Sequence, residues 1–148
     1  MADTVISFQM TNRINCFECF QPKVEAFGAA HGLSAKVVFH LTLCLDELVT
    51  NIISYGYTDF DDHPIDVTVS LEGEEIIIRI EDDAEPFNIL EAPEPELSLP
   101  LEKRARPVGG MGIHLVKNLM NKIKYTRENG KNVLVLKKTL CEGCCPHG

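Results

Sequence analysis

The sequence has no stretch that approaches the roughly 18 consecutive apolar residues typical of a membrane-spanning helix. Its N-terminus also lacks the apolar core of a secretory signal peptide. These two absences predict a cytoplasmic protein that does not enter the membrane. In that compartment the six cysteines are expected to stay reduced rather than to form disulfides.

Basic residues are scarce over residues 1–98, which contain 4 Lys and Arg against 19 Asp and Glu, a net charge of −15. So acidic a segment argues against a nucleic-acid-binding protein. Residues 99–148 have the opposite balance, with 10 Lys and Arg against 3 Asp and Glu, a net charge of +7. The basic segment can help to hold phosphate groups, although a solvated basic face explains any single lysine equally well.

The hydrophobic pattern predicts a single domain in which strands and helices occur separately. The strands form adjacent antiparallel pairs, so we expect an α+β fold: a two-layer sandwich of a mixed, mainly antiparallel sheet with helices on one face. A proline in the first turn is expected to begin the first helix, at Pro22. The expected elements are strands at 4–10, 65–71, 76–80, 123–125 and 133–136, helices at 22–30, 35–55 and from 113, and an irregular segment at 88–107 that is long enough to be a lid.

A glycine-rich turn at residues 109–112 leads into the last helix. Its residues are Gly109, Gly110, Met111 and Gly112, and an apolar helical pattern starts at Ile113. Because glycine allows close approach and a helix N-terminus attracts negative charge, this turn is a candidate phosphate site. The alternative is a turn whose glycines only permit tight packing.

Two further segments carry side chains suited to nucleotide chemistry. Glu47 and Asn51 are four residues apart and so share one face of the long helix. A carboxylate can accept a proton, and a carboxamide oxygen can coordinate Mg²⁺; a solvent-facing polar pair is the alternative. Asp82 lies at the end of a predicted strand, where its carboxylate can accept a hydrogen bond from an exocyclic amine; the alternative there is an acidic turn.

Together the three segments resemble the GHKL ATPase superfamily, which includes gyrase, histidine kinases and heat-shock chaperones. Residues 47–51 (ELVTN) are similar to its N-box, residues 82–87 (DDAEPF) to its D-x-G motif, and residues 109–112 (GGMG) to its second glycine box. The resemblance covers nearly the whole chain. The compact size and the stretches 45–57 and 109–116 most resemble the anti-sigma-factor serine/threonine kinases.

The resemblance implies a Bergerat-type fold that binds ATP or ADP with Mg²⁺. It implies that Glu47 is the general base, that Asn51 is the Mg²⁺ ligand and that Asp82 accepts the adenine amine. The lid would be roughly 88–107, and Lys103, Arg104 or Arg106 would reach the phosphates. Further nucleotide contacts are expected from Ala84, Phe87, Gly109, Gly110, Met111, Gly112, Ile113 and Arg104.

One residue departs from the family pattern, because Ala84 replaces the glycine of the D-x-G motif. If that position needs a positive φ, alanine costs roughly 1 kcal/mol or more. If the glycine serves only for close approach of the base, a methyl group is tolerated.

Three functions follow from these residues. The first is a kinase that phosphorylates Ser or Thr on a STAS-type anti-sigma antagonist and that sequesters a sigma factor when free. The second is a nucleotide-gated binding module without phosphoryl transfer, and the third is an interaction domain that has lost its nucleotide. The intact Glu47/Asn51 pair favours the first function and Ala84 favours the second. A homodimer is left open by the sequence.

The cysteines suggest a separate unit at the C-terminus. We expect the ATPase domain at residues 1–140 and a cysteine-rich tail at residues 141–148, which contains Cys141, Cys144, Cys145 and His147. With Cys16 and Cys19, the spacing allows metal ligation. Redox sensing or no role is the favoured alternative, because the tail is short and no buried shell is evident around it.

Overall fold

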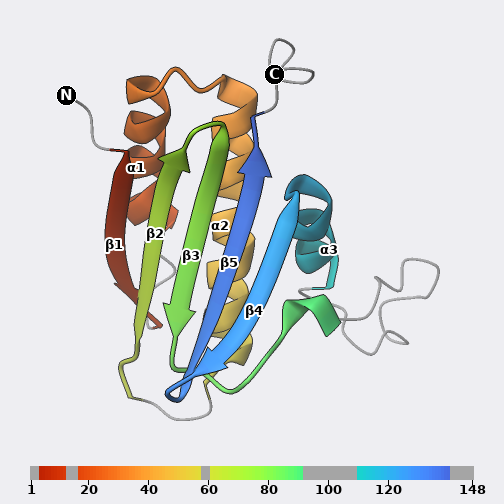
Figure 1. Ribbon diagram of the computed structural model, residues 1–148. Helices are drawn as coiled ribbons and strands as arrows, with labels where there is room; N and C mark the ends of the chain where they lie inside the picture. The colour runs from red at the N-terminus through yellow and green to blue at the C-terminus, as the bar shows by residue number, and fades with distance from the viewer. Residues whose placement is uncertain (1–3, 13–16, 58–60, 92–109, 141–148) are drawn as a thin grey trace.

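The computed structural model describes residues 4–12, 17–57, 61–91 and 110–140. They form two layers, a five-stranded sheet and helices packed on one of its faces (Figure 1). The strands are β1 (Val5–Thr11), β2 (Pro64–Glu72), β3 (Glu75–Asp82), β4 (Lys122–Glu128) and β5 (Lys131–Thr139). The predicted α+β fold is confirmed.

The strand order in the sheet is β1-β2-β3-β5-β4, and every described pairing is antiparallel. The expected mixed sheet is therefore antiparallel throughout the described residues. Side chains alternate across it: Ile76, Ile78 and Ile80 of β3 are buried against the helices, whereas Arg79 is exposed on the opposite face. This alternation is what the period of two in the sequence predicts for a sheet covered on one side.

The long helix α2 (Ala35–Tyr55) lies between α1 (Phe17–Ala30) and α3 (Gly110–Leu119) and contacts both. Its N-cap is Ser34, whose hydroxyl accepts a hydrogen bond from the Val37 N–H at 3.1 Å. Its C-cap is Gly56, whose N–H donates to the Ile52 carbonyl at 2.8 Å. Both ends of α2 agree with the prediction. No helix among the described residues is long and apolar enough to cross a membrane.

The predicted start of α1 was wrong. The helix begins at Phe17, so Pro22 lies inside it rather than in its first turn. Proline there removes one backbone donor from the helix. The fully buried side chains of Phe20 and Val24 anchor this segment in the core, and their burial offsets the lost hydrogen bond.

Two tight turns set the two hairpins. Gly73 has a φ of 62° between β2 and β3. Asn129 and Gly130 have φ values of 51° and 76° between β4 and β5, which is the backbone that an Asn-Gly hairpin turn requires. The Asn-Gly prediction is confirmed. Both hairpins extend further than predicted, because the strands stay paired up to the turns, at Glu72 with Glu75 and at Glu128 with Lys131.

The glycine turn was predicted to precede the last helix, and the structure corrects this. Helix α3 starts at Gly110, so Gly110, Met111 and Gly112 form its first turn. The start of the predicted lid is a short 3-10 helix, η1 (Ile89–Glu91), in which Ile89 is buried. Residues 92–109, which include the rest of the lid and Gly109 and Arg104, lie outside the described residues, as do residues 141–148.

Candidate nucleotide-binding site

A pocket of about 190 Å³ opens where β3 ends, between the C-terminal half of α2 and the β4–β5 hairpin. Its wall is mostly apolar and includes a few polar groups at fixed positions, as ligand pockets commonly do. Phe87 lies at its edge and is 36% exposed. The lining residues are Leu48, Asn51, Ile52, Gly56, Ile80, Asp82, Ala84, Glu85, Pro86, Phe87, Ile89, Tyr125, Asn132 and Leu134.

Asp82 is the buried carboxylate of this pocket, with 5% of its surface exposed. Its Oδ1 accepts hydrogen bonds from the Ala84 N–H at 3.0 Å and from Asn132 Nδ2 at 2.9 Å. Burial raises the pKa of Asp82, and these two hydrogen bonds oppose the rise. No hydrogen bond from the described residues reaches Oδ2, so the second oxygen of Asp82 is left to accept one from a ligand.

Ala84 does not have a positive φ, because Asn129 is the one non-glycine residue with that backbone among the described residues. The strain foreseen for alanine in the D-x-G motif is therefore absent. Its methyl group packs against Gly56 instead: a Cβ placed on Gly56 would lie 2.7 Å from the Ala84 Cβ. Gly56 thus provides the close approach that a glycine at position 84 would otherwise provide.

This contact predicts that Ala84→Gly lowers stability in the wild-type protein but raises it when residue 56 is alanine. Gly56→Ala would place a methyl group 2.7 Å from Ala84 and 2.6 Å from the Ile52 carbonyl oxygen, and it should destabilise the fold by roughly 1–3 kcal/mol. Ala84→Gly should cost roughly 0.5–1 kcal/mol alone, yet it should restore part of the stability of Gly56→Ala. Urea unfolding of the four proteins measures the coupling; strictly additive effects would show that the two residues do not share this space.

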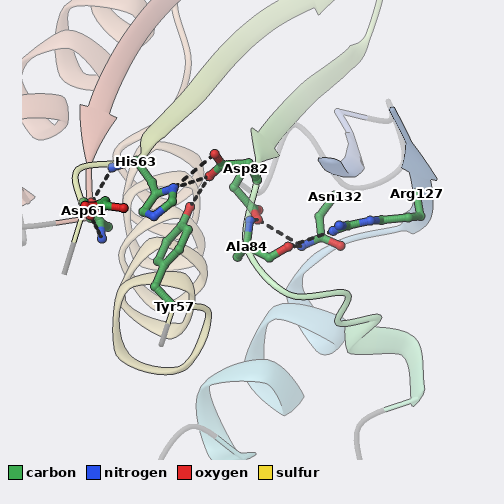
Figure 2. Close-up of polar contacts among 9 residues, drawn as sticks. Tyr57, Asp61, His63, Asp82, Ala84, Arg127 and Asn132 are labelled. Atoms are coloured by element: carbon green, nitrogen blue, oxygen red, sulfur yellow. Dashed lines mark hydrogen bonds and ion pairs between the residues drawn. The ribbon is translucent and has the colours of Figure 1, made fainter. Parts of the chain in front are cut away.

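Two residues missed by the sequence analysis, Asn132 and Arg127, hold the segment that follows Asp82 (Figure 2), and a third, Tyr125, holds Asn132. Asn132 Nδ2 donates to the Glu85 carbonyl at 2.9 Å as well as to Asp82, and Arg127 Nη1 donates to the Ala84 carbonyl at 2.8 Å. The Tyr125 hydroxyl donates to Asn132 Oδ1. The sequence offered no local signal for Asn132, which follows Lys131 and precedes the apolar run at residues 133–136.

A second cluster holds the same segment from the other side. Asp83 accepts hydrogen bonds from the Tyr57 hydroxyl at 3.1 Å and lies 3.1 Å from His63 Nδ1. The rings of Tyr57 and His63 stack with centroids 4.3 Å apart (Figure 2). Burial raises the pKa of Asp83, but the hydrogen bonds from His63 and Tyr57 outweigh it and leave the pKa below its ordinary value. The pKa values of these adjacent residues are thus shifted in opposite directions, upward for Asp82 and downward for Asp83.

Glu47 lies against the first turn of α3. A methyl group on Gly112 would lie 2.8 Å from Glu47 Cδ and closer still to Oε2. Gly112 therefore lets the Glu47 carboxyl group lie directly against α3, where the predicted N-box and the predicted glycine box meet. Burial, with a smaller contribution from the neighbouring Asp46 charge, raises the pKa of Glu47, which is the direction expected for a general base tuned toward neutral pH.

Asn51 lies one turn further along α2, and it lines the pocket although only 6% of its surface is exposed. Among the described residues no hydrogen bond uses its carboxamide. Its amide atoms are not among the fully buried unpaired polar atoms of the described residues, so they are open to the pocket, where a ligand or water can satisfy them. Its oxygen suits Mg²⁺ or a polar ligand group, so the residue fits the predicted role.

The remaining predicted contacts divide into four groups. Phe87 and Ala84 line the pocket. Ile113 is 3% exposed and packs in the core, so its backbone but not its side chain can face a nucleotide. Gly110 and Met111 lie in the first turn of α3, where N–H groups are free of intrahelical partners. Gly109 and Arg104 lie outside the described residues.

The pocket, the polar face of α2 and the N-terminus of α3 together indicate which kind of ligand the site suits. An apolar slot that ends at a buried hydrogen-bond acceptor suits a flat base that carries an amino group. Asn51 and Glu47 lead from this slot along α2 to the N-terminus of α3, where a helix terminus favours phosphate. The geometry is that of a nucleotide-binding domain.

Comparison with known proteins agrees with this class. The chain belongs to the histidine kinase-like ATPase domain family, whose model matches residues 20–138. The serine/threonine-protein kinase BtrW of Bordetella bronchiseptica is 34% identical over 103 residues, which cover 70% of this chain and 71% of that protein. The serine-protein kinase RsbW of Listeria monocytogenes is 26% identical over 110 residues, or 72% of this chain and 69% of that protein.

A solved structure supports the fold alone. The RsbU and RsbW domains of a Mycobacterium tuberculosis protein superpose with a TM-score of 0.64 at 13% sequence identity, over 91% of this chain and 32% of that one. The GHKL resemblance stated from the motifs is confirmed by these matches.

Proposed function

We propose that this protein is an ATP-dependent serine/threonine kinase that phosphorylates a STAS-type anti-sigma antagonist and that sequesters a sigma factor when the antagonist is not bound. One observation carries the proposal. Glu47 and Asn51 lie one turn apart on α2, with Glu47 against the first turn of α3 and Asn51 in the pocket that contains Asp82. The relatives named as serine and serine/threonine kinases support the reaction class. The protein would act in the cytoplasm.

The binding step uses the apolar slot. The adenine ring would lie between the apolar side chains of the pocket, with its amino group donating to Asp82 Oδ2. The phosphates would extend along α2 toward the N–H groups of Gly110, Met111 and Gly112. Asn51 would hold Mg²⁺, which neutralises phosphate charge when it is bound.

The transfer step needs a base beside the attacking hydroxyl. The hydroxyl oxygen of the antagonist's Ser or Thr would bond to the γ-phosphorus while the bond from that phosphorus to the ADP oxygen breaks. The hydroxyl proton would pass to Glu47, whose raised pKa suits a proton acceptor near neutral pH. The products are a phosphoprotein and ADP.

Two measurements test the proposal. Calorimetry with ADP and Mg²⁺ should show one site per chain, and Asn51→Ala should weaken magnesium-dependent binding. Labelled ATP should then transfer phosphate to a Ser- or Thr-bearing antagonist encoded near this gene. Nucleotide binding without transfer to any such candidate would favour the nucleotide-gated binding module, which Ala84 alone had favoured in the sequence. Absence of nucleotide binding would contradict both functions.

Gly112→Ala should separate positioning of Glu47 from stability. The new methyl group would collide with the Glu47 carboxyl group, which is the far end of a flexible side chain and can turn away at little energetic cost. The melting temperature should therefore change by no more than a few degrees. Transfer should fall by roughly 10-fold or more because the base is displaced. Unchanged transfer would show that Glu47 is not required at this position.

A further inference from the structure

The side-chain amide of Asn132 is held in one orientation. Its Oδ1 accepts from the Tyr125 hydroxyl and, at 3.4 Å, from the Phe87 N–H. Its Nδ2 donates to Asp82 Oδ1 at 2.9 Å and to the Glu85 carbonyl at 2.9 Å, with the Ala84 carbonyl at 3.3 Å. A flipped amide would place its oxygen against three acceptors, so the surroundings permit one orientation only.

The position of Asn132 in the sheet explains why it can do this. It is the direct partner of Asp82 in the register of β3 and β5, and directly opposed residues bring their Cβ atoms within roughly 5 Å. Both residues are buried, with 6% and 5% of their surface exposed. The pair therefore sits inside the pocket wall, where an unpaired polar group would be costly.

With the Asn132 amide held in this orientation, the inner end of the pocket offers a ligand a hydrogen-bond acceptor and no donor from Asn132. Both hydrogens of Asn132 Nδ2 are used by oxygen atoms of the protein, so Asn132 offers no donor to a ligand. Asp82 Oδ1 is also occupied, which leaves Asp82 Oδ2 as an acceptor. A base with an amino group at this edge can donate to it, whereas a base with a carbonyl group there meets a second acceptor.

From this geometry we propose that Asn132 is a specificity-determining residue that fixes Asp82 as a pure acceptor, with its amide held by the Glu85 and Ala84 carbonyl oxygens and by the Tyr125 hydroxyl. The pocket then selects 6-aminopurines over 6-oxopurines. The inference rests on the proposed nucleotide binding, and it adds a discrimination that Asp82 alone does not ensure. If the amide were free to turn, its NH₂ group could donate to a 6-oxo group beside Asp82.

The test compares ADP with GDP by calorimetry in four proteins: wild type, Tyr125→Phe, Asn132→Leu and a control. Tyr125→Phe removes one of the groups that hold the amide and keeps the ring, so ADP affinity and the ratio of ADP to GDP affinity should each fall a few-fold. Asn132→Leu should weaken ADP binding about 10-fold or more, since it removes a hydrogen bond to a carboxylate. Equal losses for ADP and GDP in both variants would reduce Asn132 to a structural role and overturn the proposal.

Asn121→Leu is the matched control. Asn121 also joins the strands of this hairpin region, where its Oδ1 accepts from the Thr139 N–H at 2.7 Å, but it does not line the pocket. This variant should lose stability and keep the wild-type nucleotide ratio. If Asn132→Leu does not fold, Tyr125→Phe against this control still decides the question.

A second readout needs no nucleotide. The groups that act on Asp82 besides Asn132 are the Ala84 N–H and the charges of Asp83 and Arg127, and Tyr57 lies close enough to feel its charge. None of these changes in Asn132→Leu, so carbon-13 titration of the Asp82 carboxyl should show a higher pKa than in wild type or Asn121→Leu. If the pKa of Asp82 is higher in Asn132→Leu but the wild-type protein binds no nucleotide, the proposed function is refuted and the role of Asn132 in orienting Asp82 stands. An unmoved titration would overturn the inference even where ADP binds.

Discussion

Glu47→Gln is expected to lower phosphoryl transfer to the cognate antagonist by about 10²-fold or more, the usual scale for loss of a general base. Glutamine keeps the size of the side chain beside Gly112 and removes its ability to accept a proton. ATP affinity should stay within a few-fold, because the base acts chiefly in the transition state. Single-turnover transfer of labelled phosphate measures the chemical step, and calorimetry measures binding.

The pH profile distinguishes a base from a positioning group. Wild-type transfer should fall as the pH drops through the raised pKa of Glu47, because the protonated carboxyl cannot accept a proton. This acidic limb should disappear in Glu47→Gln. Equal transfer rates for the two proteins would remove Glu47 from the mechanism.

Asp46→Asn is the matched control for this experiment. Asp46 is the neighbouring acid on α2, and its charge contributes to the raised pKa of Glu47. Its loss should leave transfer within a few-fold and move the acidic limb slightly downward, since a like charge no longer disfavours ionisation of Glu47. A loss as large as that of Glu47→Gln would mean that negative charge at this end of α2 matters more than the base itself.

The sequence predicted most of the fold because its signals were local. The Ser34 cap, the apolar face of α2 and the Asn-Gly turn each depend on residues that are near one another in the chain, and the structure confirms all three. The start of α1 was missed because tertiary burial of Phe20 overrode the preference of Pro22 for a first turn. Packing with distant residues is not visible in a local pattern.

The candidate site shows the same division. Glu47, Asn51 and Asp82 were identified because each belongs to a short motif, and the structure brings Asn51 and Asp82 into one pocket. Asn132 and Tyr125 were missed because their role is created by strand pairing. Asn132 meets Asp82 only because β5 is inserted between β3 and β4 in the sheet. Nothing in either residue's neighbours along the chain indicates that contact.

Asp82→Asn is expected to lower adenine-nucleotide affinity by about 10²-fold. The Ala84 N–H and Asn132 Nδ2 both need an acceptor at the Oδ1 position, so the new amide should keep its oxygen there. Its NH₂ group would then face the pocket and oppose the amino group of adenine. A ligand that leaves a buried polar group of its site unpaired commonly binds far more weakly than the matching ligand. Titration with ADP and GDP should show a smaller preference for adenine; unchanged ADP affinity would show that Asp82 does not contact the base.

The same substitution should not destabilise the nucleotide-free protein at neutral pH. Burial places the pKa of Asp82 above its unfolded value, so the native state binds this proton more tightly than the unfolded state does. The stability that this group provides is complete below the unfolded pKa and is lost as the pH rises through the native pKa. Asparagine has no such loss, so the melting temperature of Asp82→Asn should gain on wild type as the pH rises from about 4 toward neutrality.

Asp83→Asn is the control, and the sign of its effect should be opposite. The pKa of Asp83 lies below its ordinary value because of the hydrogen bonds from His63 and Tyr57. Its contribution to stability is therefore present above the unfolded pKa and is lost as the pH falls through the native pKa. Asp83→Asn should melt below wild type at neutral pH, approach it in acid and keep ADP affinity within a few-fold, since Asp83 does not line the pocket. If the two variants changed stability in the same direction at neutral pH, the electrostatic contrast between the adjacent aspartates would be wrong.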